Sequence, residues 1–331
     1  MKKIHISFYS VLAAILAVTI IVISFLISVC NDNSRKHKIA VILDNSQSSS
    51  WDIYKAGLNR AGEDYESEVY VVPTDDMFST VNVVSLVKEQ IEAGADGVIM
   101  QICDDTLAQE TIAYVSGNTP VVLLDGSSSI YTEINRNCAY IGFDNTRIGT
   151  CLAEEVSKLY GTNIAGKKVG IVSSGLKQKS ISDRMDALSK GLDEAGADIE
   201  WTYEYDNNES QMESQITNRL NDNPVDIVVA LDNDCLEAVT KCKLESNKEN
   251  EYVKLIGVGN SNKALYYLDT GVISALIVPN YFEMGYESVR ELSEKLDFKM
   301  RSMESSTRDF RVVYRDTMFD ESIQKYLYVV Q

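Results

Sequence analysis

The stretch "KIAVILDNSQSSSWDIYKAGL", residues 38–58, decides the fold class of this chain. After Lys38 it begins with an apolar run, Ile39 to Leu43, which is typical of a β-strand buried on both faces. Three serines then lead to Trp51, where the pattern predicts that a helix opens. A buried strand followed closely by a helix is the repeating unit of an α/β fold with a parallel sheet.

The same alternation continues along the rest of the chain. Nine further runs have strand character: 68–73, 97–102, 120–125, 138–143, 168–173, 199–205, 226–231, 253–259 and 272–278. Helical spacing is clearest in 83–94 and 183–196, and the tail 309–331 adds a strand and a short helix. Ten such runs are many for one parallel sheet, so we predict two doubly wound parallel-sheet lobes.

The N-terminal segment is set apart by an uncharged apolar run, residues 6–30, which follows Lys2 and Lys3. A membrane-spanning helix needs ~20 such residues, whereas the apolar core of a signal peptide has ~7–15. We therefore predict an N-terminal transmembrane helix, with residues 1–34 as a membrane anchor. Two alternatives stay open, because "ISVC" at 27–30 half resembles a lipoprotein cleavage box, with Cys30 lipidated, and an ordinary cleaved signal also fits. All three readings place the body outside the cytoplasm.

The composition argues against nucleic-acid binding, catalysis and metal binding as functions of this chain. The net charge is −18, and such an acidic surface repels phosphate backbones. Both histidines, His5 and His37, lie in or beside the predicted anchor, so the body has no Ser-His-Asp, Cys-His or His-metal site. The six cysteines show neither C-x-x-C nor metal-ligand spacing, and we predict no disulfide. We expect no enzymatic activity, no metal and no cofactor.

Polar and aromatic residues gather where the predicted strands end, the place where open α/β sheets bind ligands. They are Ser48, Trp51, Gln101, Asp104, Asp125, Ser180, Ser182, Arg184, Asp232, Asn233, Asn260, Asn280 and Tyr281. Each has a structural alternative: the aspartates as helix caps, Arg184 as an ion-pair partner, and Trp51 as a side chain packed on its own helix. Together, carboxylates, amides and an indole suit a polyhydroxylated ligand, through hydrogen bonds and a stacking surface.

From Lys38 to about Val330 the chain resembles the type I periplasmic sugar-binding proteins, the ribose-binding-protein-like family. The stretches that carry this resemblance run in family order: "KIAVIL…SSSWDIYKAGL", "IEAGADGVIMQICDDTL", "TPVVLLD", "AYIGFDNTRIGTCLAEEV", "SDRMDALSKGLDEAG", "VVALDNDCLEAV", "LIGVGNS" and "GVISALIVPNYFEMGYESV". The resemblance implies that Trp51 is the stacking aromatic and that Ser48 lies near an Asn that binds sugar hydroxyls. The resemblance also implies that Gln101 is a polar contact of the ligand. It implies that Asp125 is the ligand-binding carboxylate of the first lobe and that Asp232 stands where the second lobe has an Asn or Asp.

The chain departs from that family at four site positions. Gly126 and Ser182 stand where arginines are frequent, Gly259 stands where Asp is common, and Pro279 replaces a common Gln. These departures put a simple aldopentose in doubt as the ligand. The expected ligand-binding set is Ser48, Trp51, Gln101, Asp125, Ser182, Arg184, Asp232, Asn260 and Asn280.

The resemblance also implies a hinge of three crossovers between the lobes, near 143–145, near 277–280 and in the loop 296–308. Lobe 1 would comprise 38–143 and 279–297, and lobe 2 would comprise 144–278 and 308–331, with 298–307 as a hinge loop. Ligand contacts made only in the closed state would drive the lobes together.

Two roles fit this reading. The first is a membrane-tethered solute-binding protein that delivers a sugar-like ligand to an ABC permease. The second is a receptor of the same fold that signals ligand binding to a membrane histidine kinase. A regulator like the lactose repressor would need an N-terminal helix-turn-helix in place of the apolar segment, and nothing in the sequence asks for an enzyme.

Overall fold

We describe a computed structural model of the chain, in residues 16–24, 36–75, 83–102, 119–125, 136–174, 178–205, 209–245 and 252–328. The chain divides into two compact units, Met1–His37 and Lys38–Gln331. In the first unit a helix covers 16–24, and most of the predicted span, 6–30, lies outside the described residues. Among the residues that are described, no helix is both long enough and apolar enough to cross a membrane.

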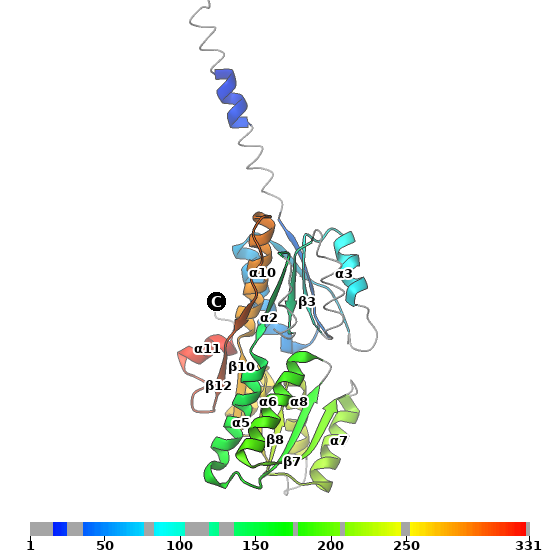
Figure 1. Cartoon of the computed structure of the whole chain (residues 1–331), viewed down its shortest axis with the longest axis vertical. Helices are drawn as coiled ribbons and strands as arrows, with labels where there is room; N and C mark the ends of the chain where they lie inside the picture. The colour runs from blue at the N-terminus through cyan, green and yellow to red at the C-terminus, as the bar shows by residue number, and fades with distance from the viewer. Residues whose placement is uncertain are drawn as a thin grey trace, which may run out of the picture. The chain divides into compact units, whose positions relative to one another are not determined.

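The second unit, which we call the body, contains two lobes, each built on its own sheet (Figure 1). The strands of the first lobe are β1 (Lys38–Ile42), β2 (Glu68–Val71), β3 (Gly97–Gln101), β4 (Val121–Leu124), β5 (Cys138–Phe143) and β11 (Ser306–Arg308). They pair in the order β11-β5-β4-β3-β1-β2, and all the pairs are parallel. The helices are α2 (Asp52–Asp64), preceded by the short 3₁₀ helix η2 (Ser49–Trp51), α3 (Val83–Glu92) and α10 (Tyr281–Asp297).

The second lobe repeats this plan. Its strands are β6 (Lys168–Ser174), β7 (Asp198–Tyr205), β8 (Ile227–Ala230), β9 (Lys254–Val258), β10 (Ala275–Pro279) and β12 (Phe310–Val313), in the order β12-β10-β9-β8-β6-β7. Among the described strands of this sheet, β12 alone runs antiparallel to its neighbour, β10. The helical segments are α5 (Asn145–Tyr160), η4 (Gly161–Asn163), α6 (Lys179–Ala195), α7 (Glu209–Asp222), α8 (Asn233–Glu245), α9 (Asn262–Asp269) and α11 (Glu321–Leu327).

Both sheets are covered on both faces, which is why their strands read as continuous apolar runs. In β1, Ile39 and Val41 face the core that α2 and α10 cover, whereas Ala40 and Ile42 face the core that α3 covers. Figure 1 shows α2 and α10 side by side on one face of the first sheet, with α3 on the other. The two-lobe α/β fold with parallel sheets, and all ten predicted strands, are therefore confirmed.

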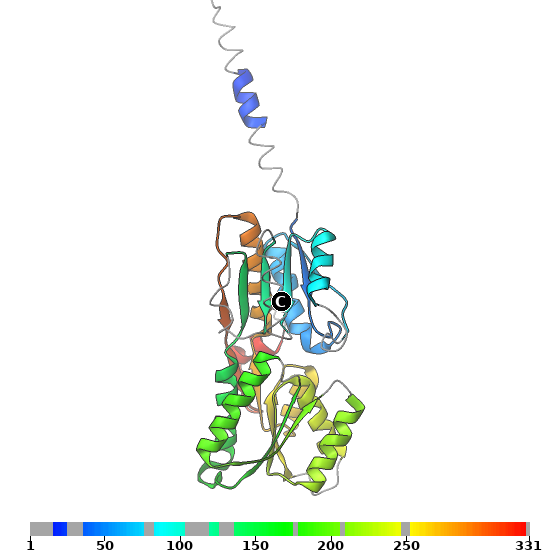
Figure 2. The ribbon, with the colours of Figure 1, turned by 45° about the vertical axis from the view of Figure 1, so that its right-hand side comes forward.

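The chain passes between the lobes at three places (Figure 2). The first two lie where the resemblance placed them, between β5 and α5 and between β10 and α10. The third is at Asp309, not in the expected loop 298–307, because β11 pairs with β5 of the first sheet before β12 joins β10 of the second. The sequence analysis missed β11, a polar strand of only three residues.

Hydrogen bonds tie two of these crossings together. The Asn280 backbone N–H donates to the Asp309 carbonyl at 3.0 Å, and the Asn280 side-chain amide donates to the Asp309 carboxylate at 3.3 Å. The Tyr326 hydroxyl of α11 donates to the other oxygen of that carboxylate at 2.5 Å. Burial would raise the pKa of Asp309, but the bonds from Tyr326 and Asn280 outweigh it and lower that pKa. The carboxylate therefore holds the second and third crossings and the C-terminal helix in one network.

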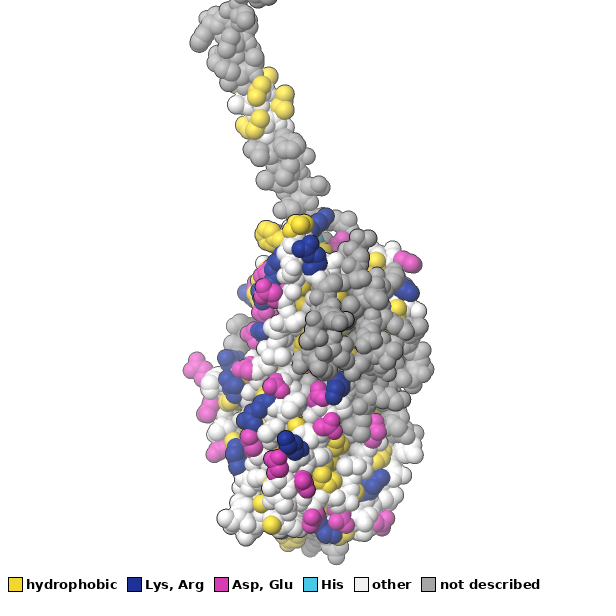
Figure 3. All heavy atoms as spheres, viewed as in Figure 1, with side chains coloured by type: hydrophobic (Ala, Val, Ile, Leu, Met, Phe, Trp, Pro, Cys, Tyr) yellow, Lys and Arg dark blue, Asp and Glu magenta, His cyan; other side chains and the backbone are white. Residues whose placement is uncertain are grey.

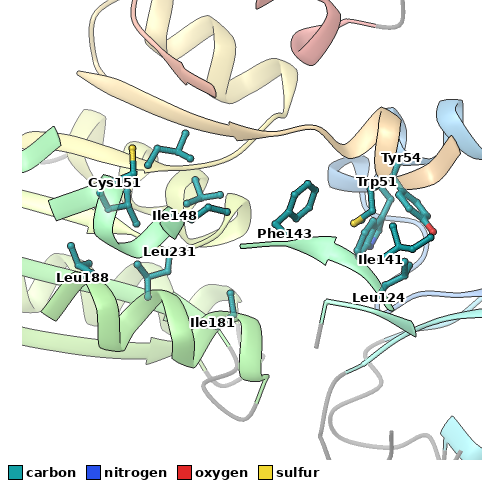
Figure 4. Close-up of a cluster of buried hydrophobic side chains, with 14 of the residues drawn as sticks. Trp51, Tyr54, Leu124, Ile141, Phe143, Ile148, Cys151, Ile181, Leu188 and Leu231 are labelled. Carbon is teal, nitrogen blue, oxygen red and sulfur yellow. The ribbon is translucent and has the colours of Figure 1, made fainter. Parts of the chain in front are cut away.

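One apolar core runs through the hinge from lobe to lobe. Figure 4 shows Phe143, the last residue of β5, between a first-lobe group around Trp51 and Tyr54 and a second-lobe group around Ile148. The four cysteines that the structure describes, Cys138, Cys151, Cys235 and Cys242, are free and buried. They serve as small core side chains.

Candidate ligand-binding site

A cavity of about 330 Å³ lies between the lobes of the body. Its described lining residues are Asp44, Asn45, Ser48, Ser50, Trp51, Gln101, Asp125, Ser174, Gln178, Ser180, Ile181, Arg184, Tyr205, Asp232, Asn233, Asp234, Asn260 and Tyr281. Many of them follow the carboxyl ends of β1 and β3 in one lobe and of β6 and β8 in the other. The strand order reverses at those positions in each sheet, and doubly wound folds bind ligands at such switch points.

The wall after β1 is held by local hydrogen bonds. The Asp44 backbone N–H donates to the Gln101 side-chain oxygen at 2.8 Å, which ties the end of β1 to the end of β3. Ser48 caps η2, because its hydroxyl oxygen accepts the Ser50 backbone N–H at 3.3 Å. The three serines thus form a short helical turn that carries Trp51 to the start of α2.

Trp51 lines the cavity from within the core. Its side chain is 8% exposed, and its indole N–H donates to the Asp44 carbonyl at 3.0 Å. The ring meets Tyr54 and Tyr281 edge to face, with centroids 5.6 and 6.4 Å apart. The indole is a buried wall of the cavity, because α10 brings Tyr281 against it.

Asp125 lies directly after β4 and lines the cavity. Its φ is 58°, a left-handed conformation that Asp tolerates better than most residues. The residue is 6% exposed, and its Oδ1 has no hydrogen-bond partner among the described residues. Burial raises the pKa of this carboxyl, and the charge of Arg184 offsets part of that rise. A strained, buried and unsatisfied carboxyl is typical of a functional position.

Arg184 is 3% exposed and joins α6 to the hinge. Its Nε donates to the Asn145 side-chain oxygen at 2.8 Å, and its Nη1 donates to the Leu231 carbonyl at 2.9 Å. Two of its donor groups therefore hold the start of α5 and the end of β8. Both partners are neutral, so these contacts are structural hydrogen bonds and not the ion pair that the sequence left open. The same side chain also lines the cavity.

The turn after β8 supplies three polar residues in a row, of which Asp232 is the helix cap. Its Oδ1 accepts the Cys235 backbone N–H at 2.9 Å, and its Oδ2 accepts the Ser174 backbone N–H at 2.8 Å. Asp232 therefore caps α8, the alternative that the sequence analysis named. Asn233 turns its side-chain oxygen towards the backbone N–H groups of Asn260 and Ser261, which fixes the turn after β9.

Asp234, the third residue of that turn, also lines the cavity. Desolvation by the surrounding protein, followed by the negative charges of Asp232 and Glu237, raises its pKa to about 7. Asp44 of the first lobe adds to this rise. The sequence analysis passed over Asp234, although a strongly shifted pKa in a cleft is a mark of functional sites.

Asn260 connects the lobes across the cavity. Its side-chain amide donates to the Ser50 carbonyl of the first lobe at 3.4 Å. The residue is 4% exposed, and its Oδ1 has no hydrogen-bond partner in the described part of the chain. Asn260 thus presents a buried acceptor to the cavity.

Seven of the nine expected residues line the cavity: Ser48, Trp51, Gln101, Asp125, Arg184, Asp232 and Asn260. Ser182 and Asn280 do not. Ser182 bonds to the Lys179 carbonyl of its own helix, and Asn280 caps α10 and bonds to Asp309. Asp104, the expected cap after β3, lies outside the described residues, as do Cys30 and Gly126.

Residues 39–300 match the periplasmic binding protein domain family. The chain belongs to this family. Its members bind solutes and are not enzymes, which agrees with the expectation from the sequence. A comparison with curated proteins gives no match.

Solved structures share the fold at low sequence identity. A carbohydrate transporter solute-binding protein from Agrobacterium radiobacter, in complex with D-arabinose, is 17% identical with a TM-score of 0.77, over 89% of this chain and 100% of that one. A Caulobacter myo-inositol binding protein bound to myo-inositol is 17% identical with a TM-score of 0.77, over 88% and 98%. A XylFII-LytSN complex is 22% identical with a TM-score of 0.74, over 85% and 99%. At these identities the likeness establishes the fold.

Proposed function

We propose that the chain is an extracytoplasmic solute-binding protein that closes its two lobes on a small polyhydroxylated ligand for ABC-type uptake. The observation that carries the proposal is the cavity between the lobes, with Asp44, Gln101 and Asp125 on one side and Asp232, Asp234 and Asn260 on the other. Hydroxyl groups both donate and accept hydrogen bonds, so they pair well with carboxylates and amides. The volume lies at the lower end of the range of small-molecule sites, about 300–1,000 Å³.

Aromatic side chains support a ring-shaped ligand. Trp51, Tyr205 and Tyr281 line the same cavity, and aromatic faces stack on the C–H faces of sugar-like rings. Similar proteins with D-arabinose and myo-inositol bound support this class.

The test is a thermal-shift screen of the fragment 36–331 against aldoses, ketoses, polyols and their derivatives, followed by calorimetry. A ligand present at 100 times its Kd stabilises a folded protein by about 2.7 kcal/mol, which moves the melting temperature by several degrees. Asp125→Asn serves as the site variant and Asp193→Asn, on the exposed side of α6, as the control. Ligand binding that survives Asp125→Asn unchanged would place the site elsewhere.

A sensing role is the second candidate, and the similar XylFII-LytSN complex favours it. In that role the ligand-bound body would bind the extracytoplasmic part of a sensor kinase instead of a permease. Purified body with and without ligand, mixed with each candidate partner domain, separates the two roles. Ligand-dependent binding to a permease alone would exclude the sensor.

The apolar segment 6–30 is proposed to keep the protein at the outer side of the membrane, either as a helix or through a lipid on Cys30. Its length supports the helix, and "ISVC" at 27–30 supports the lipid.

A further inference from the structure

The walls of the cavity carry far more negative than positive charge. Their carboxylates are Asp44, Asp125, Asp232 and Asp234, and Arg184 is the single cation among the described lining residues. Arg184 is already engaged with Asn145 and the Leu231 carbonyl, and its charge acts on Asp125. The second-lobe carboxylates, Asp232 and Asp234, have no cation opposite them among the described lining residues.

The buried groups that lack partners in the cavity include two acceptors. Asp125 Oδ1 and Asn260 Oδ1 have no hydrogen bond among the described residues, and both residues are more than nine-tenths buried. They stand on opposite lobes, and Asn260 is neutral, so it is independent of the acidic residues. Buried acceptors without donors cost about 1–3 kcal/mol each, so a ligand that brings donors to these two positions is favoured.

The carboxylates do not converge on one point. Within the described residues, no group of three or more Asp, Glu, His or Cys side chains is placed to hold a metal ion. The described carboxylates therefore offer no ready site for a divalent cation, and a larger cation with several donors fits them better. Trp51, Tyr205 and Tyr281 complete the wall, and aromatic faces attract organic ammonium groups.

We propose that the ligand of this cavity carries an ammonium group beside its hydroxyls, as an amino sugar or an aminopolyol does. This inference rests on the proposed function and narrows its ligand class. An ammonium offers three donors and no acceptor, which matches the unpaired oxygens. Its positive charge lies among the carboxylates Asp44, Asp232 and Asp234, where charge-assisted hydrogen bonds form.

The raised pKa of Asp234 agrees with an ammonium group in the ligand. The groups that act on it are Asp232, Asn233 and Glu237 of its own turn and helix and Asp44 across the cleft. Three of these four are negative, so a cation beside Asp234 relieves their mutual repulsion.

The test compares ligands in matched pairs by calorimetry near neutral pH. The pairs are D-glucosamine with D-glucose, D-galactosamine with D-galactose, and 1-amino-1-deoxy-D-sorbitol with D-sorbitol, with N-acetyl-D-glucosamine as a neutral amide. We expect the amine of at least one pair to bind about tenfold or more tightly than its neutral partner. Acetylation should remove this advantage.

The variant Asp234→Asn tests the preference for an ammonium group from the side of the protein, because it removes the charge of the carboxylate and keeps the shape of the side chain. The preference for the amine should shrink by about tenfold in this variant and stay unchanged in Asp193→Asn. Equal or tighter binding of the neutral partners would overturn the inference and leave the proposed function standing. An unchanged preference in a folded Asp234→Asn would also overturn it. Failure of every ligand, neutral and amine, to bind would contradict the proposed function together with this inference.

Discussion

Trp51 has two roles that the sequence could not separate. Its indole N–H bonds to the end of β1, its ring packs against Tyr54 and Tyr281, and part of its surface faces the cavity. A side chain that is both wall and core links ligand affinity to stability, so its substitution should change both.

We expect Trp51→Ala to lower the free energy of unfolding by about 3–5 kcal/mol, because it leaves a large cavity in the core. Trp51→Phe keeps most of the ring and loses the bond to Asp44, so it should cost about 1 kcal/mol. Urea denaturation measures both values, and calorimetry should show ligand affinity falling in the same order. The control is Trp201→Phe, in the separate core of the second lobe. A folded Trp51→Ala with normal ligand affinity would show that the ring does not contact ligand.

We expect Asp234 to make ligand binding depend on pH. Its pKa of about 7 in the free protein lies above the usual value for Asp, so much of the carboxyl is protonated at neutral pH. A cationic ligand favours the ionised form. Its affinity is therefore fully present above pH 7 and is lost as the pH falls through 7.

Between about pH 8 and pH 6 we expect the affinity for an amine ligand to fall roughly tenfold. Calorimetry with 1-amino-1-deoxy-D-sorbitol, a ligand that remains protonated over this range, measures the change. Asp234→Asn should flatten the profile, whereas Asp193→Asn should keep it. A neutral ligand that binds better at low pH would instead indicate that the protonated Asp234 donates a hydrogen bond to it.

At the scale of elements, the close approach of α2 and α10 positions one side of the site. A methyl group on Gly57 would overlap the Phe282 carbonyl oxygen, and one on Gly285 would overlap the Tyr54 carbonyl oxygen. The two backbones meet because neither glycine has a side chain. Trp51 and Tyr281, at the start of these helices, are brought into contact as a result.

Gly285→Ala should therefore separate the two helices and lower stability by about 1–3 kcal/mol, the usual cost of overpacking. Ligand affinity should fall as well, since the Trp51–Tyr281 wall moves. Thermal unfolding and calorimetry measure these effects. Asn59→Ala, on the exposed side of α2, is the control and should leave both values nearly unchanged. A stable, normally binding Gly285→Ala would mean that the helix pair adjusts without moving the wall.

At the scale of the whole molecule, negative charge is spread over the face of the body that Figure 3 draws. On the face drawn in Figure 3, Asp and Glu side chains are interspersed with Lys and Arg over both lobes of the body. The net charge of −18 therefore acts mainly on solubility and on the choice of partners. The acidic lining of the cavity is a local feature with its own geometry.

The apolar segment 6–30 should hold the full-length protein in the membrane fraction, and deletion of residues 1–34 should release it. Fractionation followed by immunoblotting measures this distribution. Cys30→Ser distinguishes the two kinds of attachment, because it removes a lipid site and leaves the apolar run intact. Membrane binding that persists in this variant supports the helix, and release supports the lipid.

The ten main strands and their division between two sheets could be read from the sequence. The predicted helix 83–94 agrees closely with α3, whereas α6 begins at Lys179, four residues before the predicted start of 183–196. Strands buried on both faces must be apolar at every position, so runs such as 97–102 and 226–231 were plain to read. The polar strand β11 was not, because Ser306–Arg308 lies at a sheet edge and only its pairing with β5 makes it a strand.

Only the tertiary structure decided which side chains at the strand ends face the cavity. Asn280 and Tyr281 are neighbours, yet Tyr281 lines the cavity while Asn280 bonds to Asp309 behind it. Ser182 points away while Arg184, two positions on, lines the cavity. The reason is that successive residues of a helix point about 100° apart, so the rotation of the helix on its sheet selects the lining residues. That rotation is set by packing contacts far apart in the sequence, which no local pattern records.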